Sequence, residues 1–385
     1  MLRKLHSLPG LVAGLLLVLV ALTGAWLSAF PALERLQAAD AAAGTDVATL
    51  AARVSARVPG VETLVREPSG RLIAYHLVGD AQQASVIDPA DGSVVAAYTP
   101  SALQRWVKNL HRRLLLDDAG RITVGLAAGS LLLITVSGGL MLARRLGGWR
   151  RLLTPVRGTP LQRLHDETAR VALAGLVLSA ATGVLMSLAS FGLLPEGGGS
   201  DPLLDARPSA TTRLPLDRMP ALQATDLAQL RQLKLASPDD PADVIELETA
   251  DGTGAVDPAT GRWLAFTPLD GWQRLHGTVR LLHTGDGLWW LGLLLGATTL
   301  SVPLLAVTGT LLWWRRRQAL PRLAGNAAPQ DADTVLLVGS EGNTSWGFAV
   351  ALHDALTRAG LRVHTAPMNA LATRYRQAQR LLVLT

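Results

Sequence analysis

Four long apolar runs divide the chain, at residues 9–30, 122–142, 171–194 and 288–314, and none of them contains Asp, Glu, Lys or Arg. A helix that crosses the hydrocarbon core of a bilayer needs about 20 such residues. The pattern therefore predicts four membrane-spanning helices. A cleaved signal peptide is the alternative interpretation of the first run, because Arg3 and Lys4 precede it. The run is long for such a peptide, however, and Ser28-Ala29-Phe30-Pro31 is a poor cleavage site.

The segments between the runs have a different pattern. Residues 46–58 have the apolar spacing of an amphipathic helix, and residues 61–67 and 71–78 alternate as strands do. The pattern over 221–233 and 244–248 is similar and predicts a second helix followed by a strand. Each segment is therefore expected to form its own small module, a helix on an antiparallel sheet.

The chain is internally repeated, which predicts two copies of one span–module–span unit. In the first copy, Gly24 lies eighteen residues after His6, in the pairs Leu5-His6 and Thr23-Gly24. In the second copy, Gly183 lies eighteen residues after His165, in the pairs Leu164-His165 and Thr182-Gly183. Ser137-Gly138 and Thr308-Gly309 end the two copies in the same way. Asp88-Pro89 and Asp257-Pro258 also correspond, and each is expected to form a turn between two strands. The glycines could admit a second planar group or could serve helix packing.

Basic residues set the expected orientation, because Lys and Arg favour the cytoplasmic side. They precede the first run, fill the connection between the second and third, and follow the fourth. Both termini are then cytoplasmic, and the net charge of +6 reflects membrane anchoring and no nucleic-acid partner. The expected parts are span 1 at 1–30, an outer module at 31–118, span 2 at 119–143, a basic loop at 144–165, span 3 at 166–194, an outer module at 195–284, span 4 at 285–315, a linker at 316–332 and an α/β segment at 333–385.

Four histidines lie at the ends of the runs: His6 and His165 at the cytoplasmic ends, and His111 and His283 at the outer ends. Ionisable groups in membrane segments are functional by default. Paired across helices, the four could ligate two haem irons. His276 is the alternative to His283, because counting forward from Trp272 matches it to His111. Zinc is the weaker alternative, since four ligands from opposite faces cannot converge on one ion.

The absence of cysteine excludes covalent haem and cysteine-ligated clusters, so any haem is b-type and non-covalent. Ligation by two histidines leaves no open coordination position on the iron, which suits electron transfer. Basic side chains near each end could pair with the haem propionates, or could simply anchor the helices. These are Arg112, Arg113 and Arg280 outside, and Arg3, Lys4 and Arg163 inside. His76, His353 and His364 are expected to be ordinary surface or core residues.

After a polar linker, the tail begins with an apolar strand at 334–338, a polar loop and a helix through Ala359, followed by strands at 362–365 and 380–384. This order is typical of a doubly wound α/β domain. The loop is Ser340, Glu341, Gly342, Asn343, Thr344 and Ser345. It resembles the FMN phosphate loop of flavodoxin-like domains, one residue shorter than the common pattern. The resemblance implies that the chain covers about a third of such a domain and stops before the loops that bind the flavin ring.

Residues 1–320 resemble the PepSY-associated transmembrane family, through Leu110-His111-Arg112 and Leu282-His283-Thr284-Gly285. The resemblance implies a membrane α-helical protein: a four-helix bundle, two periplasmic α+β PepSY modules and the start of a cytoplasmic flavodoxin-like domain. Members with that fusion are often labelled the flavoprotein subunit of sulfite reductase. The fusion implies that NADPH reduces FAD, then FMN, then two membrane haems, and finally a periplasmic acceptor such as a ferric siderophore.

A binding or regulatory protein is the rival hypothesis. The outer modules would then bind an envelope peptidase or another partner, and the helices would act only as anchors. The histidines separate the two hypotheses, because an anchor does not need them.

Overall fold

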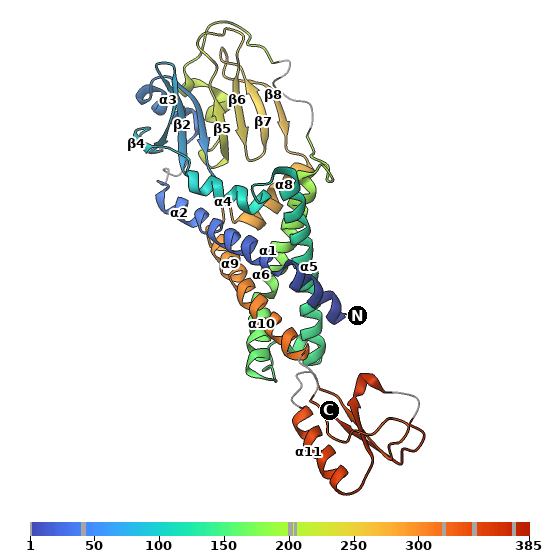
Figure 1. Cartoon of the computed structure of the whole chain (residues 1–385). Helices are drawn as coiled ribbons and strands as arrows, with labels where there is room; N and C mark the ends of the chain where they lie inside the picture. The colour runs from blue at the N-terminus through green and yellow to red at the C-terminus, as the bar shows by residue number, and fades with distance from the viewer. Residues whose placement is uncertain are drawn as a thin grey trace. The chain divides into compact units, whose positions relative to one another are not determined.

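The computed structural model describes residues 2–39, 44–198, 203, 206–317, 321–340, 345–371 and 375–385. The chain divides into two compact units, which are described separately. One unit consists of Met1–Val12, Gly138–Arg170 and Pro303–Thr385, and the other of Ala13–Ser137 and Val171–Val302. Figure 1 shows the order of the elements along the chain.

Four helical segments in the described residues are long and apolar enough to cross a membrane, as the hydrophobic pattern predicts. The first consists of α1 (Leu2–Leu27) and the short α2 (Phe30–Gln37), and the second is α5 (Asp117–Leu146). The third is α6 (Pro160–Ser190). The fourth is divided at Leu300 into α9 (Trp289–Thr299) and α10 (Ser301–Arg317). The expected basic loop at 144–165 was too long, because α6 begins at Pro160 and already contains His165.

Small residues let these helices approach each other in the larger unit. A Cβ on Gly125 of α5 would lie 2.3 Å from Ser187 Oγ of α6, and one on Gly175 of α6 would lie 2.5 Å from Thr298 Oγ1 of α9. A Cβ on Gly296 of α9 would lie 2.3 Å from Ser28 Oγ, just after α1. Close backbone approach at glycine is the usual way for apolar helices to pack in lipid. Within this unit the four spans therefore form a bundle.

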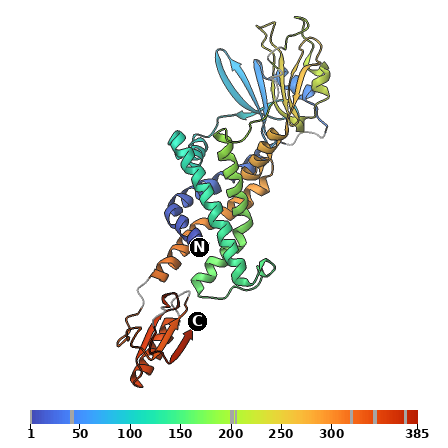
Figure 2. The same ribbon diagram turned by 90° about the vertical axis from the view of Figure 1, so that its right-hand side faces the viewer.

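The regions between the spans form one sheet in place of the two separate modules expected. Its eight strands run in the order β4-β3-β2-β1-β5-β6-β7-β8, so the first strand of each repeat lies at the centre. Figure 2 shows the blue strands of the first repeat beside the yellow strands of the second. The strands are β1 (Val61–Arg66), β2 (Leu72–Val78), β3 (Ala81–Ile87), β4 (Val94–Ala97), β5 (Leu230–Lys234), β6 (Ile245–Thr249), β7 (Gly252–Val256) and β8 (Trp263–Pro268).

The central pairing joins β1 and β5 in antiparallel register, with Leu64 opposite Leu233. Both leucines belong to a core that also includes α3 (Val47–Arg57), whose Leu50 and Val54 are fully buried. Asp46 begins α3 by accepting a hydrogen bond from the Thr49 amide at 2.7 Å. Two separate modules would each leave an apolar strand edge open, and pairing these two edges removes that exposure.

The helix expected over 221–233 is wrong. The segment contains only a short helix, α7 (Pro220–Gln223), and a 3₁₀ turn (Leu227–Gln229) before β5 begins. The Asp226 side chain accepts from the Ala228 amide at 2.7 Å and so stabilises the turn. Leu230 and Leu233 are buried in the strand, so tertiary pairing with β1 overrides the helical pattern.

Two amphipathic helices connect the sheet to the spans. These are α4 (Ala102–Arg113), before α5, and α8 (Gly271–Thr284), before α9. Ser101 and Asp270 cap their N-termini, and the Asp270 cap is reinforced by Gln273 in a capping box. The predicted turns at Asp88-Pro89 and Asp257-Pro258 are confirmed, since they connect β3 to β4 and β7 to β8.

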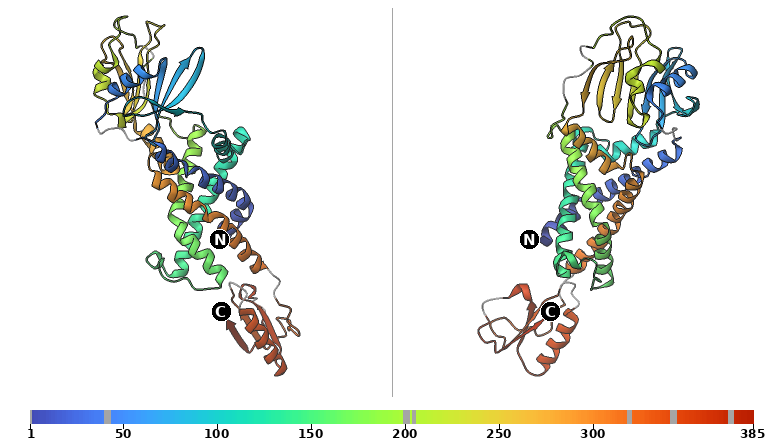
Figure 3. Two further views of the ribbon diagram at one scale, coloured as in Figure 1. Left: turned by 90° about the vertical axis from the view of Figure 1, so that its left-hand side faces the viewer. Right: turned by 180° about the vertical axis from the view of Figure 1, so that it is seen from behind.

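The tail forms a separate parallel sheet in the smaller unit, with strand order β10-β9-β11. Its elements are β9 (Thr334–Val338), α11 (Ser345–Arg358), β10 (Val363–Pro367) and β11 (Arg380–Leu384). Helix α11 lies beside this sheet (Figure 3). Its Trp346 and Ala349 are buried against β9. The three predicted strands and the helix are therefore confirmed as secondary structure.

Candidate functional site

The four histidines at the span ends come together as two pairs. His6 on α1 and His165 on α6 have ring centres 6.4 Å apart, with an angle of 86° between the ring planes. His111 on α4 and His283 on α8 also have ring centres 6.4 Å apart, with an angle of 42°. Each pair takes one histidine from each repeat and lies within a single compact unit.

A glycine in a spanning helix makes room for each imidazole. A Cβ added to Gly24 or Gly138 would lie 2.9 Å from Cε1 of His111 or His6, respectively. A Cβ added to Gly183 or Gly309 would lie 3.3 Å from Cε1 of His283 or His165. The glycines therefore receive histidine rings, and each histidine contacts the glycine of its own repeat.

The residue before each of three of these glycines is a threonine that contacts the Nδ1 atom of the ring. Thr23 Oγ1 lies 3.1 Å from Nδ1 of His111, Thr182 Oγ1 lies 3.0 Å from that of His283, and Thr308 Oγ1 lies 2.8 Å from that of His165. The sequence marked these threonines as repeat positions but did not indicate this role. The fourth position is Ser137, which is buried.

In His111, His165 and His283, these contacts favour a proton on Nδ1. The hydroxyls of Thr182 and Thr308 donate to the carbonyls of Leu178 and Leu304 in their own helices, at 2.6 and 2.7 Å, so their oxygens accept from Nδ1. The Val20 carbonyl, which can only accept, lies 3.0 Å from Nδ1 of His111. A neutral imidazole protonated on Nδ1 keeps its lone pair on Nε2, the state in which Nε2 ligates a metal.

The outer pair lies in surroundings that favour the neutral ring. The pKa of His111 is lowered to about 4, mainly by burial and also by the nearby His283. Burial also lowers the pKa of His283. Both histidines lie on α4 and α8, outside the spans. Neutral imidazole is the form that binds metal, so neither ring needs to lose a proton near neutral pH.

The spacing of each pair would let both imidazoles bind one metal ion between them. A histidine nitrogen lies about 2 Å from a metal that it ligates, which puts the centres of two such rings on opposite sides of the ion roughly 6.4 Å apart. A haem at either pair would need no protein ligand beyond the two imidazoles. The observed 6.4 Å in both pairs meets this requirement.

A family model described as the PepSY-associated TM region matches residues 3–316. The chain belongs to this family. The matched range contains both histidine pairs and all four glycines, and it ends before the tail. Comparison with curated proteins finds no sequence match. The family and the four spans make this a membrane protein built of helices.

Not every residue singled out from the sequence of this PepSY-associated membrane protein lies at a pair. His276 is half-buried, and its Nε2 lies 2.9 Å from the Pro195 carbonyl, so the geometry favours His283 as the partner of His111. His76 is buried in the sheet beside Ser85. His353 is buried beside Thr365 in the tail, where His364 bonds to the Ala327 carbonyl.

The basic side chains proposed for propionates are mostly exposed or already paired. Arg113 forms an ion pair with Asp117 at 3.3 Å, and Arg280 forms one with Asp286 at 3.4 Å. The others are Arg3, Lys4, Arg112 and Arg163, all exposed. Their role at a haem stays a prediction.

The predicted phosphate loop lies largely outside the described residues, which leave out Glu341, Gly342, Asn343 and Thr344. Of its two described ends, the Ser345 amide donates to Ser340 Oγ at 3.3 Å. FMN binding at this loop therefore stays a prediction.

Proposed function

We propose that the chain carries electrons across the bacterial inner membrane through two b-type haems, one held by His6 and His165 and the other by His111 and His283. Bound haem would supply a one-electron couple at each pair. The chain's own contribution is to hold the imidazoles and to keep Nδ1 of His111, His165 and His283 protonated. The observation that carries the proposal is the pairing itself: two pairs, each with ring centres 6.4 Å apart and each with a glycine beside every ring.

The direction of transfer follows from charge and from the tail. Basic residues flank the spans at the ends that bear His6 and His165, which favours a cytoplasmic location for that pair. The tail has strand order β10-β9-β11, the 2-1-3 order that begins a flavodoxin-like sheet. We therefore propose that a flavin on the cytoplasmic side, FMN supplied by FAD and NADPH, reduces the inner pair. The outer pair would then reduce a periplasmic acceptor, a ferric siderophore or another ferric chelate.

Absorbance spectra of the purified full chain test the proposal. Reduced-minus-oxidised spectra should contain b-type haem bands, with two haems per chain by pyridine haemochrome assay. His111→Ala and His6→Ala should each remove about half of the haem, because each destroys one pair. His276→Ala is the matched control on α8, seven residues from His283, and should keep both haems. A folded chain that takes up no haem would overturn the proposal.

The rival function, a binding module anchored by helices, has one structural feature in its favour. Edge strand β4 is exposed along its whole length and could pair with a strand of a partner. A His111→Ala/His283→Ala variant that retained full cellular activity would favour this rival.

A further inference from the structure

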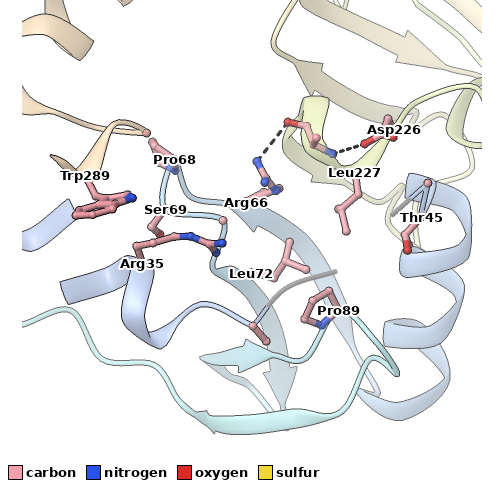
Figure 4. A pocket seen from close by; sticks show the side chains of 15 residues that line it. Arg35, Thr45, Arg66, Pro68, Ser69, Leu72, Pro89, Asp226, Leu227 and Trp289 are labelled. Carbon is pink, nitrogen blue, oxygen red and sulfur yellow. Dashed lines mark hydrogen bonds between the residues drawn. The ribbon is translucent and has the colours of Figure 1, made fainter. Parts of the chain in front are cut away.

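The larger unit contains a cavity of about 570 Å³ at the side of the sheet that faces α2 and the start of α9. Its walls come from the turn between β1 and β2, the 226–228 turn, α2 and Trp289 (Figure 4). Cavities of about 300–1,000 Å³ are the usual size for small-molecule sites.

Two arginines direct their charges to one point in this cavity. A Cβ on Gly70 would lie 3.7 Å from Nη1 of Arg35 and 3.7 Å from Nη2 of Arg66. Gly70 has a φ of +93°, a backbone conformation that favours glycine, so no side chain occupies this space. Nη1 of Arg66 donates to the Ala228 carbonyl at 3.2 Å, which fixes that guanidinium with its other nitrogen toward Gly70 (Figure 4).

The local charge favours an anion. Burial lowers the pKa of Arg66, and the positive charges of Arg231 and Arg35 add to this effect, with Asp226 acting in the opposite sense. The Asp226 carboxylate is engaged by the Ala228 amide. Two guanidinium groups held together in a concave wall raise the local concentration of anions and match the planar oxygens of carboxylates.

We propose that this cavity binds a small polycarboxylate anion through Arg35 and Arg66, and that this anion is the chelator carrying ferric iron to the outer histidine pair. Delivery of iron to the outer pair rests on the proposed function, whereas binding of the anion does not. The cavity borders two segments linked to the outer pair. Gly287 and Trp289 follow the helix of His283, and α2 follows α1, whose Thr23 and Gly24 contact His111. Trp289 adds an aromatic wall to the basic one.

Calorimetry on the full chain in detergent tests this with gallium(III) citrate, a redox-inert counterpart of ferric citrate. We expect saturable binding of one equivalent. Arg35→Gln and Arg66→Gln should each weaken it about tenfold or more, because each removes a charged hydrogen-bond partner. Arg66→Lys keeps the charge but loses the planar fork, so it should give an intermediate loss. Arg262→Gln is the matched control: it removes one exposed charge from the β7–β8 turn of the same sheet and should leave binding unchanged.

Binding that is absent, or equal in wild type and Arg35→Gln, would overturn the assignment. Binding that phosphatidylglycerol abolishes in nanodiscs, while phosphatidylcholine does not, would also overturn it, because the site would then hold a lipid headgroup. Haem spectra of the same samples separate the two proposals. A chain that holds two haems but binds no gallium citrate refutes the polycarboxylate site alone, and a chain that binds gallium citrate without haem refutes electron transfer alone.

Discussion

Both repeats pack a glycine against each histidine, but the contact is closer in the first repeat than in the second. In the first repeat, a Cβ at either glycine would come within 2.9 Å of the imidazole, whereas in the second it would come only within 3.3 Å. The first distance is shorter than side-chain contacts allow, and the second needs only a small shift of the ring. The two copies therefore share the pairing of each histidine with a glycine but differ in how closely the two pack.

Alanine at the four glycines should have the largest effect and should differ between repeats. Gly24→Ala and Gly138→Ala should each remove about one haem of the two, because the new methyl group displaces His111 or His6 from its partner. Gly183→Ala and Gly309→Ala should retain most of their haem. The pyridine haemochrome assay measures the ratio of haem to protein. Alanine favours helix by about 1 kcal/mol over glycine, so the exchange does not weaken the helix itself. Equal losses in both repeats would contradict the comparison.

Removal of a threonine hydroxyl should have a smaller effect on the same sites. Thr308→Val, Thr182→Val and Thr23→Val should each lower haem affinity about tenfold at one pair, because the partner that orients the ring is lost. Thr→Ser at the same positions keeps the hydroxyl and is the control. Haem transfer to apomyoglobin measures the loss. If valine and serine variants released haem at the same rate, the hydroxyl would have no orienting role.

The two Asp-Pro turns also differ between repeats. The Asp257 carboxylate accepts from the Ala259 amide and from the hydroxyls of Ser209 and Thr260, at 3.0, 2.6 and 2.8 Å, whereas Asp88 accepts from the Ala90 amide at 2.8 Å. Asp257→Ala should therefore cost about 2 kcal/mol of stability, and Asp88→Ala about 1 kcal/mol. Thermal melts of the detergent-solubilised chain measure both.

The Asp257 contribution should depend on pH. Burial acts to raise the pKa of Asp257, but the hydrogen bonds from Ser209, Ala259 and Thr260 outweigh it, so the pKa is lowered. A group with a lowered pKa stabilises the fold above its unfolded pKa, near 3.9 for Asp, and this stability is lost as the pH falls below that value. The gap in melting temperature between wild type and Asp257→Asn should therefore narrow from pH 7 to pH 3. A gap that widened on acidification would contradict the assigned pKa direction.

The smallest effect should come from the turns between the histidine helices and the spans. In the first repeat, Leu114 and Leu115 have φ values of +52° and +60°, whereas the second repeat has Gly285 at +76°. Leu115 is exposed, so Leu115→Gly should relieve strain and stabilise the chain by about 1 kcal/mol. Gly285→Ala should destabilise it, since the Cβ would lie 2.4 Å from the Gly292 amide nitrogen. A lower melting temperature for Leu115→Gly would indicate that Leu115 packs against lipid.

Much of this arrangement was predictable from the sequence, because its signals are local or repeated. The four spans follow from uninterrupted apolar runs, and the choice of four histidines follows from their equivalent positions in two copies. His276 and His283 could not be separated by counting, because both lie on one face of α8. The structure favours His283, whose ring faces His111.

The remainder depends on contacts between segments far apart in the chain. Nothing in β1 or β5 alone indicates that the two would pair, and without that pairing residues 221–233 have a helical pattern. The threonine hydroxyls were also not predictable, because a Thr-Gly pair in an apolar helix usually serves packing. Only the positions of His111, His165 and His283 give Thr23, Thr308 and Thr182 their second role.

The central pairing of β1 with β5 and the crossed histidine pairs have the form of a two-fold dimer whose subunits are joined end to end. Neither half of the polypeptide alone possesses a finished pair. Linking the halves frees the protein from the demand that both subunits be identical, so one half can diverge while the other keeps its original form.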